Sequence, residues 1–368
     1  MFSSNNKISI RQLQILLILD IFGMGITFLP KKMVEFAGQN GWICVVFGSI
    51  LACFCVWILT SLAEKFPNDS FVTYCGKIVT KPVAYIITAG FVVKIILTVS
   101  MELRIFSEIV KQTILFNTPY YVISICMLLL GAYGALKGYE SRGRIAEILI
   151  FIIFIPLFII FGFVASGADY TNLLPFWDFN NKSLILGSVV SLFMFSGIEF
   201  VLLAYPYLNN SKKAKKESIK AVVFIGIIMS VITIVTIAKF GPFDIKNQIW
   251  PVLELMNTVD IPGAFLERQD AIVMSFWIMS VFIIINAGIF FSALLSKDVI
   301  NKGKNFWYII AISVIVFFVS IIPNDIKQVI DFTNRIYIYF GAIYSFLIPL
   351  LLLIIAKIRK VGGNIEKN

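Results

Sequence analysis

The chain has 368 residues and a formal net charge of +10, and 59% of its residues are hydrophobic while only 14% are charged. Soluble domains carry about 25% charged residues, so this composition leaves too little polar surface to face water and excludes an ordinary soluble protein. The sequence contains no histidine, which excludes imidazole metal sites and histidine-based catalytic triads.

The motifs of the sequence also argue against an enzyme. It has no G-x-S-x-G motif, no nucleotide-binding loop and no carboxylate pair at catalytic spacing. Its five cysteines are odd in number and most lie inside apolar runs, so we expect them to pack rather than to form disulfides or bind a metal. We therefore expect no catalytic residue, no cofactor and no metal site.

Ten apolar windows predict ten transmembrane helices. In chain order they cover residues 12–29, 42–63, 83–110, 119–136, 145–166, 184–207, 219–239, 271–295, 306–322 and 334–357. The first window could be taken for a signal peptide, but Asp20 interrupts it and no cleavage site follows, so we interpret it as a retained helix. Residues 1–368 are thus expected to form a single membrane domain.

Lysine and arginine residues are unevenly distributed between the two predicted sides of the membrane. With the N-terminus placed inside, the cytoplasmic segments hold 20 of the 31 basic residues and the outer segments hold 7. Because basic residues accumulate on the cytoplasmic side, this ratio predicts that both termini are cytoplasmic. It also explains the positive net charge without nucleic acid, since the run Lys212–Lys220 is expected to face anionic lipid of the bilayer.

Two predicted helices contain helix-breaking residues in mid-membrane. The first contains Gly23-Met24-Gly25, and the sixth contains Ser196-Gly197-Ile198-Glu199. Glycine is costly in a helix interior, and a glutamate in hydrocarbon is more so. We therefore expect helices one and six to be interrupted at these positions, which lie about 173 residues apart.

The interruptions open two matching sets of five helices, residues 12–166 and 184–357. In each set a long connection with a short amphipathic stretch joins the second helix to the third, at residues 64–82 and 240–270. Because five is an odd number, the second set is inverted relative to the first. The sequence therefore predicts an all-α membrane protein with a five-plus-five inverted repeat, an architecture of secondary transporters.

Such interruptions predict a ligand that carries both signs of charge. A broken helix frees N–H groups, which attract a carboxylate, and carbonyl groups, which attract an ammonium. We therefore expect an amino acid between the two interruptions. Its carboxylate would bind at the first interruption, at Gly23, Gly25, Ile26 and Thr27. Its amine would face the second, at Phe195, Gly197, Ile198 and Glu199. The third and eighth helices would complete the cavity with Thr98, Met101, Glu102, Asn286 and Phe290.

Three of these residues have a purely structural alternative. Thr98 and Met101 could simply pack inside the bundle. Asn286 could instead make a hydrogen bond between two helices, as polar residues in membrane helices often do.

The carboxylates Asp20, Glu102 and Glu199 are candidates for coupling or gating. Asp20 could bind a proton or a cation, or be solvated in an inner vestibule. Glu102 could instead form a structural ion pair with Arg104 and Glu108. Glu199 must be protonated, paired with a cation or exposed to a water-filled cavity, because an unpaired carboxylate in mid-membrane is expensive.

Both interruption sequences resemble motifs of the amino acid–polyamine–organocation transporter superfamily. Residues 23–26 are similar to its first-helix G-x-G-I, and residues 195–199 to its sixth-helix F-x-G-x-E. A narrower resemblance, to the B subunit of spore-germination nutrient receptors, the endospore germination permeases, covers most of the chain. The segments that carry it are 29–31, 37–42, 102–106 and 266–272. Two departures, Lys31 for a common arginine and Gln269 for a frequent aromatic residue, do not touch the proposed pocket.

The resemblance implies a sensing role. Such a subunit detects a small nutrient, often an amino acid, in the inner membrane of a dormant spore and acts with an A subunit and a lipoprotein C subunit. Ligand binding would shift the bundle between two states, and a partner would sense the shift. The alternative function is an amino acid transporter driven by protons or sodium.

Overall fold

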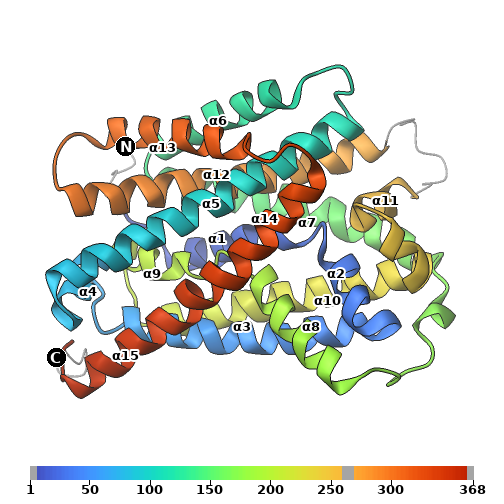
Figure 1. Ribbon diagram of the computed structural model, residues 1–368, viewed down its shortest axis with the longest axis horizontal. Helices are drawn as coiled ribbons and strands as arrows, with labels where there is room; N and C mark the ends of the chain where they lie inside the picture. The colour runs from blue at the N-terminus through green and yellow to red at the C-terminus, as the bar shows by residue number, and fades with distance from the viewer. Residues whose placement is uncertain (1–5, 259–268, 363–368) are drawn as a thin grey trace.

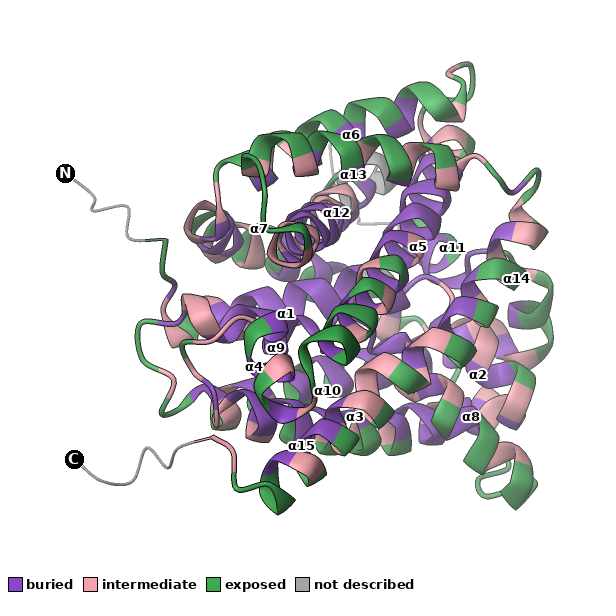
Figure 2. Cartoon of the chain, turned by 60° about the vertical axis from the view of Figure 1, so that its left-hand side comes forward, coloured by how far each residue is buried: buried purple, intermediate pink, exposed green. Residues whose placement is uncertain are grey.

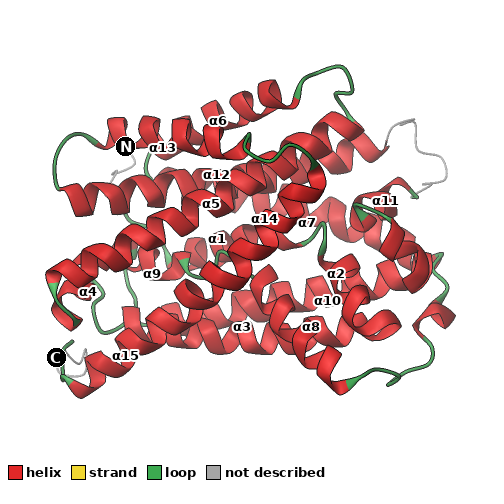
Figure 3. Cartoon of the chain, viewed as in Figure 1, coloured by secondary structure: helices red, strands yellow, loops and turns green. Residues whose placement is uncertain are grey.

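The computed structural model describes residues 6–258 and 269–362. Within these residues the chain is helical and has no strand (Figure 3). Residues 266–268 of one family-like segment, and residues 259–268 of the connection 240–270, lie outside the described residues. The prediction of an all-α protein with many apolar helices is confirmed.

The helices follow one another with short connections (Figure 1). The first seven are α1 (Ile10–Gly25), α2 (Leu29–Ala37), α3 (Gly41–Ala63), α4 (Phe71–Ile78), α5 (Lys81–Thr113), α6 (Tyr120–Leu136) and α7 (Tyr139–Ser166). The others described are α8 (Asn181–Met194), α9 (Phe200–Ala204), α10 (Ala214–Asn247), α11 (Pro251–Asn257), α12 (Gln269–Ile300), α13 (Asn305–Ser320), α14 (Ile326–Ile336) and α15 (Ile348–Ile358). A π-helix, Tyr337–Leu347, joins α14 to α15 and is called the π segment below.

Each predicted span coincides with one of these helices or with an interrupted pair. By length and composition, six continuous stretches can cross a bilayer, and α6, α8 and α13 are shorter apolar helices. The fifth helix begins at Tyr139 rather than at residue 145. This shift is a correction, because it moves Arg142 from a predicted cytoplasmic loop into a helix, where it is buried.

Both predicted interruptions are present. The first separates α1, which ends at Gly25, from α2, and the second separates α8, which ends at Met194, from α9. A Cβ atom at Gly25 would lie 2.5 Å from the carbonyl oxygen of Met194, so the two broken ends touch where only glycine fits. Gly197 in the second interruption has a φ of +102°, which a side chain would make costly.

The central helices are held together by small residues. A Cβ atom at Gly48 of α3 would lie 2.4 Å from Ser191 Oγ of α8, and one at Gly226 of α10 would lie 2.6 Å from Ser49 Cβ of α3. Close approach through small residues is the usual way in which membrane helices gain packing energy. The helices α3, α8 and α10 therefore form a tight group.

Burial differs strongly along the bundle. In α12, 78% of the most apolar window is buried, whereas in the continuous stretch from α14 to α15 the share is 22%. Figure 2 shows buried residues concentrated in α1, α12 and the inner faces of α5 and α10, while α6 and α15 expose much of their surface. The last helical stretch therefore lies at the periphery, with most of its apolar surface available to lipid.

The first and the last described segments of the chain lie at the same end of the bundle (Figure 1). The N–H of Ile8 donates to the carbonyl of Tyr207 at 2.7 Å, and Arg359 Nη1 donates to the carbonyl of Ile78 at 2.6 Å. These bonds fasten the N-terminal segment to the chain after α9 and the C-terminal segment to the end of α4.

The glycine packing predicts that replacing glycine by alanine changes the melting temperature differently at two sites. Gly48→Ala should lower the melting temperature of the purified protein, because the new methyl group meets Ser191. Gly162→Ala in α7, where no atom lies within 4 Å of the Cβ position, should leave it unchanged or raise it, since alanine favours a helix by about 1 kcal/mol over glycine. Equal melting temperatures for the two variants would contradict this account of the packing.

Candidate ligand site

The two interruptions meet in the middle of the bundle. Besides the contact of Gly25 with Met194, the Cβ position of Gly197 lies 3.4 Å from Cβ of Asp20. The two interrupted segments are therefore in direct contact with each other.

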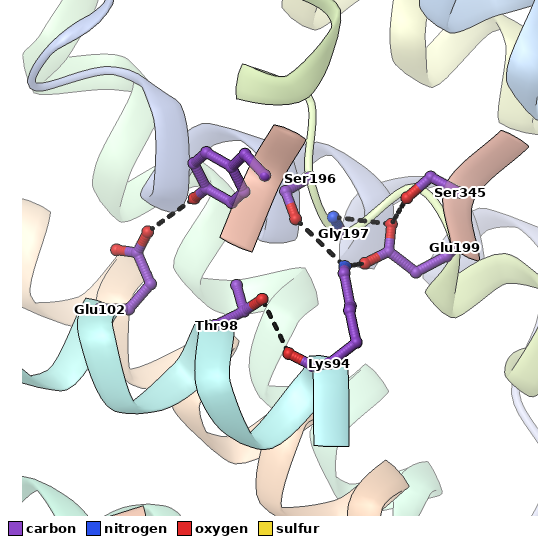
Figure 4. A network of polar contacts seen from close by, with 8 residues as sticks. Lys94, Thr98, Glu102, Ser196, Gly197, Glu199 and Ser345 are labelled. Carbon is purple, nitrogen blue, oxygen red and sulfur yellow. Dashed lines mark hydrogen bonds and ion pairs between the residues drawn. The ribbon is translucent and has the colours of Figure 1, made fainter. Parts of the chain in front are cut away.

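Glu199 is held in a network of polar contacts at the second interruption (Figure 4). Its Oε1 pairs with Nζ of Lys94 from α5, and both side chains are 1% exposed. Its Oε2 accepts hydrogen bonds from the N–H of Gly197 and from Oγ of Ser345, each at 3.2 Å. Lys94 Nζ also lies 3.4 Å from Oγ of Ser196. Of the three states considered for Glu199, the structure shows pairing with a cation.

Asp20 forms a second buried ion pair one helix away. Its Oδ1 accepts a bond from Nη2 of Arg142, and the two side chains are each 2% exposed. The same guanidinium lies 3.5 Å from the carbonyl of Ile283 in α12. Asp20 is thus buried and paired rather than solvated, and the pair ties α1 to α7 and α12.

Glu102 lies apart from both ion pairs. Its Oε1 accepts a hydrogen bond of 3.1 Å from the hydroxyl of Tyr337 in the π segment. Arg104 pairs with Glu108 at 2.8 Å and stacks over the ring of Tyr120. The structural ion pair weighed for this cluster therefore forms between Arg104 and Glu108 and leaves Glu102 to face a cavity.

That cavity, called the α2–α14 cavity, encloses about 500 Å³. Phe28 of the first interruption and Met194 before the second form part of its wall, and Glu102 and Tyr337 line it from α5 and the π segment. Lys31, Lys32 and Glu35 of α2 also line it. Its lining carries both signs of charge, from Lys31 and Lys32 and from Glu35 and Glu102.

The first interruption is a short linker between α1 and α2. It contains Ile26, the C-cap of α1, and Thr27. The side chains of both residues line a second cavity of about 370 Å³, together with Phe22 and Trp277. These two predicted ligand residues therefore lie at the break, on a different cavity from the one that Glu102 lines.

The candidates on α5 lie near the paired charges. The hydroxyl of Thr98 donates to the carbonyl of Lys94 at 2.9 Å, and Met101 is buried. These contacts agree with the packing alternative considered for both residues, and they place Thr98 one turn from the ion pair.

The candidates on α12 are not brought into this region. Asn286 Nδ2 donates to the carbonyl of Gly131 at 3.0 Å, which is the predicted alternative of a bond between helices. Phe290 stacks on Tyr139 with ring centroids 5.5 Å apart. Gly23 packs against Ile284 of α12. These residues join α12 to α6, α7 and α1.

Four residues of the site were not singled out from the sequence, namely Lys94, Arg142, Tyr337 and Ser345. Lys94 carried a usable signal, because a lysine in the middle of an apolar span needs a buried partner. Tyrosine and serine are ordinary in membrane helices, so Tyr337 and Ser345 were not distinguishable from packing residues. Arg142 was expected in a cytoplasmic loop.

Comparison with known proteins places the chain among relatives of the same length. A family described as "Spore germination protein" matches residues 7–329. The chain is 30% identical to spore germination protein YndE of Bacillus subtilis (strain 168), over 98% of this chain and 99% of the relative. It is also 30% identical to spore germination protein GerLB of Bacillus cereus, over 94% and 93%. Identity to spore germination protein KB of Bacillus subtilis (strain 168) is 23%, over 96% and 95%.

The ion pair of Lys94 and Glu199 predicts a strong coupling between two substitutions. Lys94→Met should cost about 3–5 kcal/mol, because it leaves a buried charge unpaired. Adding Glu199→Gln removes that charge and should restore part of the loss, since the amide still accepts the N–H of Gly197. Thermal unfolding of the two single variants and the double variant measures this coupling. The control is Lys239→Met, at a half-buried lysine of α10 that has only a long contact of 3.5 Å with the carbonyl of Gly167, and it should cost little. Additive losses in the Lys94 and Glu199 variants would exclude a coupled pair.

Proposed function

We propose, because this chain belongs to the spore germination protein family, that it is the membrane subunit of a germinant receptor that binds a small nutrient, an amino acid, and triggers germination. The observation that carries the proposal is that two interrupted helices meet beside the α2–α14 cavity, whose lining includes two carboxylates and two lysines. A zwitterion offers matching charges to such a lining.

In this proposal the ligand lies in the α2–α14 cavity. Its carboxylate is placed toward Lys31 and Lys32, which line this cavity at the N-terminal end of α2, where the helix dipole also favours an anion. Ile26 and Thr27 line the second cavity instead. The ammonium of the ligand is placed toward Glu102, since Glu199 is already paired with Lys94. The side chain of the ligand would contact Phe28 and the other apolar wall residues.

The proposed fold is a ten-helix bundle with an inverted repeat of residues 12–166 and 184–357. In an inverted repeat each helix of one half has a counterpart in the other half: α1 corresponds to α8, α3 to α10, α5 to α12 and α6 to α13. If two helices are in contact, their two counterparts should also be in contact. The contact of α3 with α8 becomes that of α10 with α1, and α5 with α13 becomes α12 with α6. The amphipathic helices follow the same rule, since α4 packs on α5 and α11 on α12. Such paired contacts support a repeat.

The proposed location is the inner membrane of the spore, with both termini in the cytoplasm. The terminal segments lie at one end of the bundle together with the lysine-rich start of α10 (Figure 1), and basic residues favour the cytoplasmic side. The proposed partners are the A and C subunits of the same receptor, which would sense a change in the bundle.

The ion pairs favour a receptor over an ion-driven carrier, the second candidate. Asp20 and Glu199 are the carboxylates beside the interruptions, and each is paired with a basic side chain of the protein. A sodium ion at either carboxylate would have to displace Arg142 or Lys94 from a buried pair, which is costly. The bundle is therefore suited to a change of state on ligand binding without a coupled ion.

Ligand binding is tested by thermal unfolding of the purified chain with each of the twenty common L-amino acids. One or a few of them should raise the melting temperature, by about 2.7 kcal/mol of stabilisation at a hundredfold excess over the dissociation constant. Glu102→Gln should weaken the effect, whereas Glu108→Gln, which removes a carboxylate paired outside the cavity, should not. Vesicles containing the chain alone should take up none of the stabilising amino acids; concentrative uptake would favour the transporter.

The orientation is tested by labelling single cysteines in a variant whose five native cysteines are replaced by alanine. An impermeant maleimide added to intact cells should label Lys182→Cys, in the connection before α8, and spare Lys213→Cys at the start of α10. Both positions are exposed, so access to the reagent decides the result. The opposite pattern would place the termini outside.

A further inference from the structure

The tenth span contains an unusual backbone element. Between α14 and α15 the chain forms a π-helix of 11 residues, Tyr337–Leu347. π-helical runs are rare, are mostly single turns, and occur frequently at functional sites. A segment of this length therefore requires specific contacts to hold it.

The π segment serves two carboxylates on different helices. Tyr337, at its start, donates to Glu102 of α5 at 3.1 Å. Ser345, near its end, donates to Glu199 of the second interruption at 3.2 Å. Figure 4 shows Glu102 and Glu199 on opposite sides of the Lys94 side chain. One short element thus contacts the cavity carboxylate and the buried ion pair.

The same segment forms part of the wall of two cavities. Tyr337 lines the α2–α14 cavity. Together with Gly341 and Ser345 it also lines another cavity of about 320 Å³, called the Cys55 cavity, which includes Cys55 of α3 and Ser196 of the second interruption. A movement of the π segment would therefore change both cavities together.

The geometry of the backbone makes the two bonds interdependent. A π-helix closes i→i+5 hydrogen bonds and so takes up more residues per turn than the 3.6 of an α-helix. Each residue of a π-helix therefore rotates less about the helix axis than a residue of an α-helix. Over the eight residues from Tyr337 to Ser345, this changes the angle between the directions of the two side chains by a large amount. An α-helical backbone could not aim both side chains at their present partners, so the two bonds and the π geometry stabilise one another.

The surroundings leave room for such a change. The stretch that contains the π segment is only 22% buried in its most apolar window, so few protein contacts hold its outer side. On the inner side, Gly90 of α5 accommodates Tyr344, whose hydroxyl would lie 1.7 Å from a Cβ at that position. Lipid on one side and glycine on the other permit rotation at lower cost than in the tight group of α3, α8 and α10.

We propose that Tyr337 and Ser345 are positioning residues of a helix switch: the π segment holds Glu102 and Glu199 in the present state, and its conversion to an α-helix releases both together. The link to nutrient sensing rests on the proposed function, because a ligand that binds Glu102 competes with Tyr337 for the same carboxylate. The switch itself is a property of the chain without ligand and is tested separately.

Cys55 is a native reporter for the switch, since it lines the Cys55 cavity and is 2% exposed. The other four cysteines are replaced by alanine in the full chain, and the rate at which N-ethylmaleimide alkylates Cys55 is followed by mass spectrometry. Tyr337→Phe and Ser345→Ala should each raise this rate between about threefold and tenfold, the change in an equilibrium that one net hydrogen bond supplies. Deleting Ala342, which shortens the π segment by one residue, should raise it at least as much.

Matched controls separate the switch from a general loss of stability. Tyr339→Phe removes the same hydroxyl from a residue of the π segment that is 65% exposed to the outside, and it should leave the rate unchanged. Ser313→Ala in α13, whose hydroxyl bonds its own helix, should also leave it unchanged. If the deletion variant does not fold, the two point variants still decide, provided that their melting temperatures stay close to that of the parent chain.

The outcomes distinguish the switch from the proposed function. Wild-type rates for Tyr337→Phe and Ser345→Ala, or equal increases in the two controls, overturn the switch even if amino acids stabilise the chain. Raised rates in both variants, with no L-amino acid of the panel affecting the parent chain, support the switch and count against amino acid sensing. Raised rates, together with acceleration of Cys55 alkylation in the parent by the stabilising L-amino acids, support both.

Discussion

A lysine ammonium and a glutamate carboxylate face each other inside the bundle, and the interruption of the sixth span depends on them. Neither charge is tolerable alone in this interior, because an unpaired buried ion costs far more than a hydrogen bond. Lys94 neutralises Glu199, and the second carboxylate oxygen accepts the N–H of Gly197, a donor that the break in the helix releases. The ion pair and the interruption therefore stabilise each other.

The relative strength of the contacts indicates which of them can change. Separating a buried ion pair costs about 3–5 kcal/mol, whereas a net hydrogen bond contributes about 0.5–1.5 kcal/mol. The pairs Lys94–Glu199 and Asp20–Arg142 are thus fixed points, and the bonds from Tyr337 and Ser345 are the weaker contacts. A change of state in this bundle can therefore exchange the weaker bonds while the two ion pairs stay intact.

The bundle combines a rigid group with a loosely held edge. Glycines bring α3, α8 and α10 into close contact, and closely packed interiors transmit strain rather than absorb it. The stretch from α14 to α15 has little protein around it, yet it contacts the carboxylates of α5 and of the second interruption. A displacement at either carboxylate can therefore reach this exposed edge through the bonds of Tyr337 and Ser345.

The sequence by itself determined the apolar spans and the two interruptions, with a carboxylate near each. These features are local, because hydropathy, glycine and a buried charge act on the segment that contains them. The pairing of Glu199 with Lys94, the burial of Arg142 beside Asp20 and the reach of Tyr337 to Glu102 were decided only by the tertiary structure. Asn286 and Phe290 show the same limit, since their helix was expected at the site and the packing turned them toward α6 and α7. The physical reason is that the contacts of a side chain depend on which helices are neighbours and on how each helix is rotated about its axis. Both depend on the packing of the whole bundle.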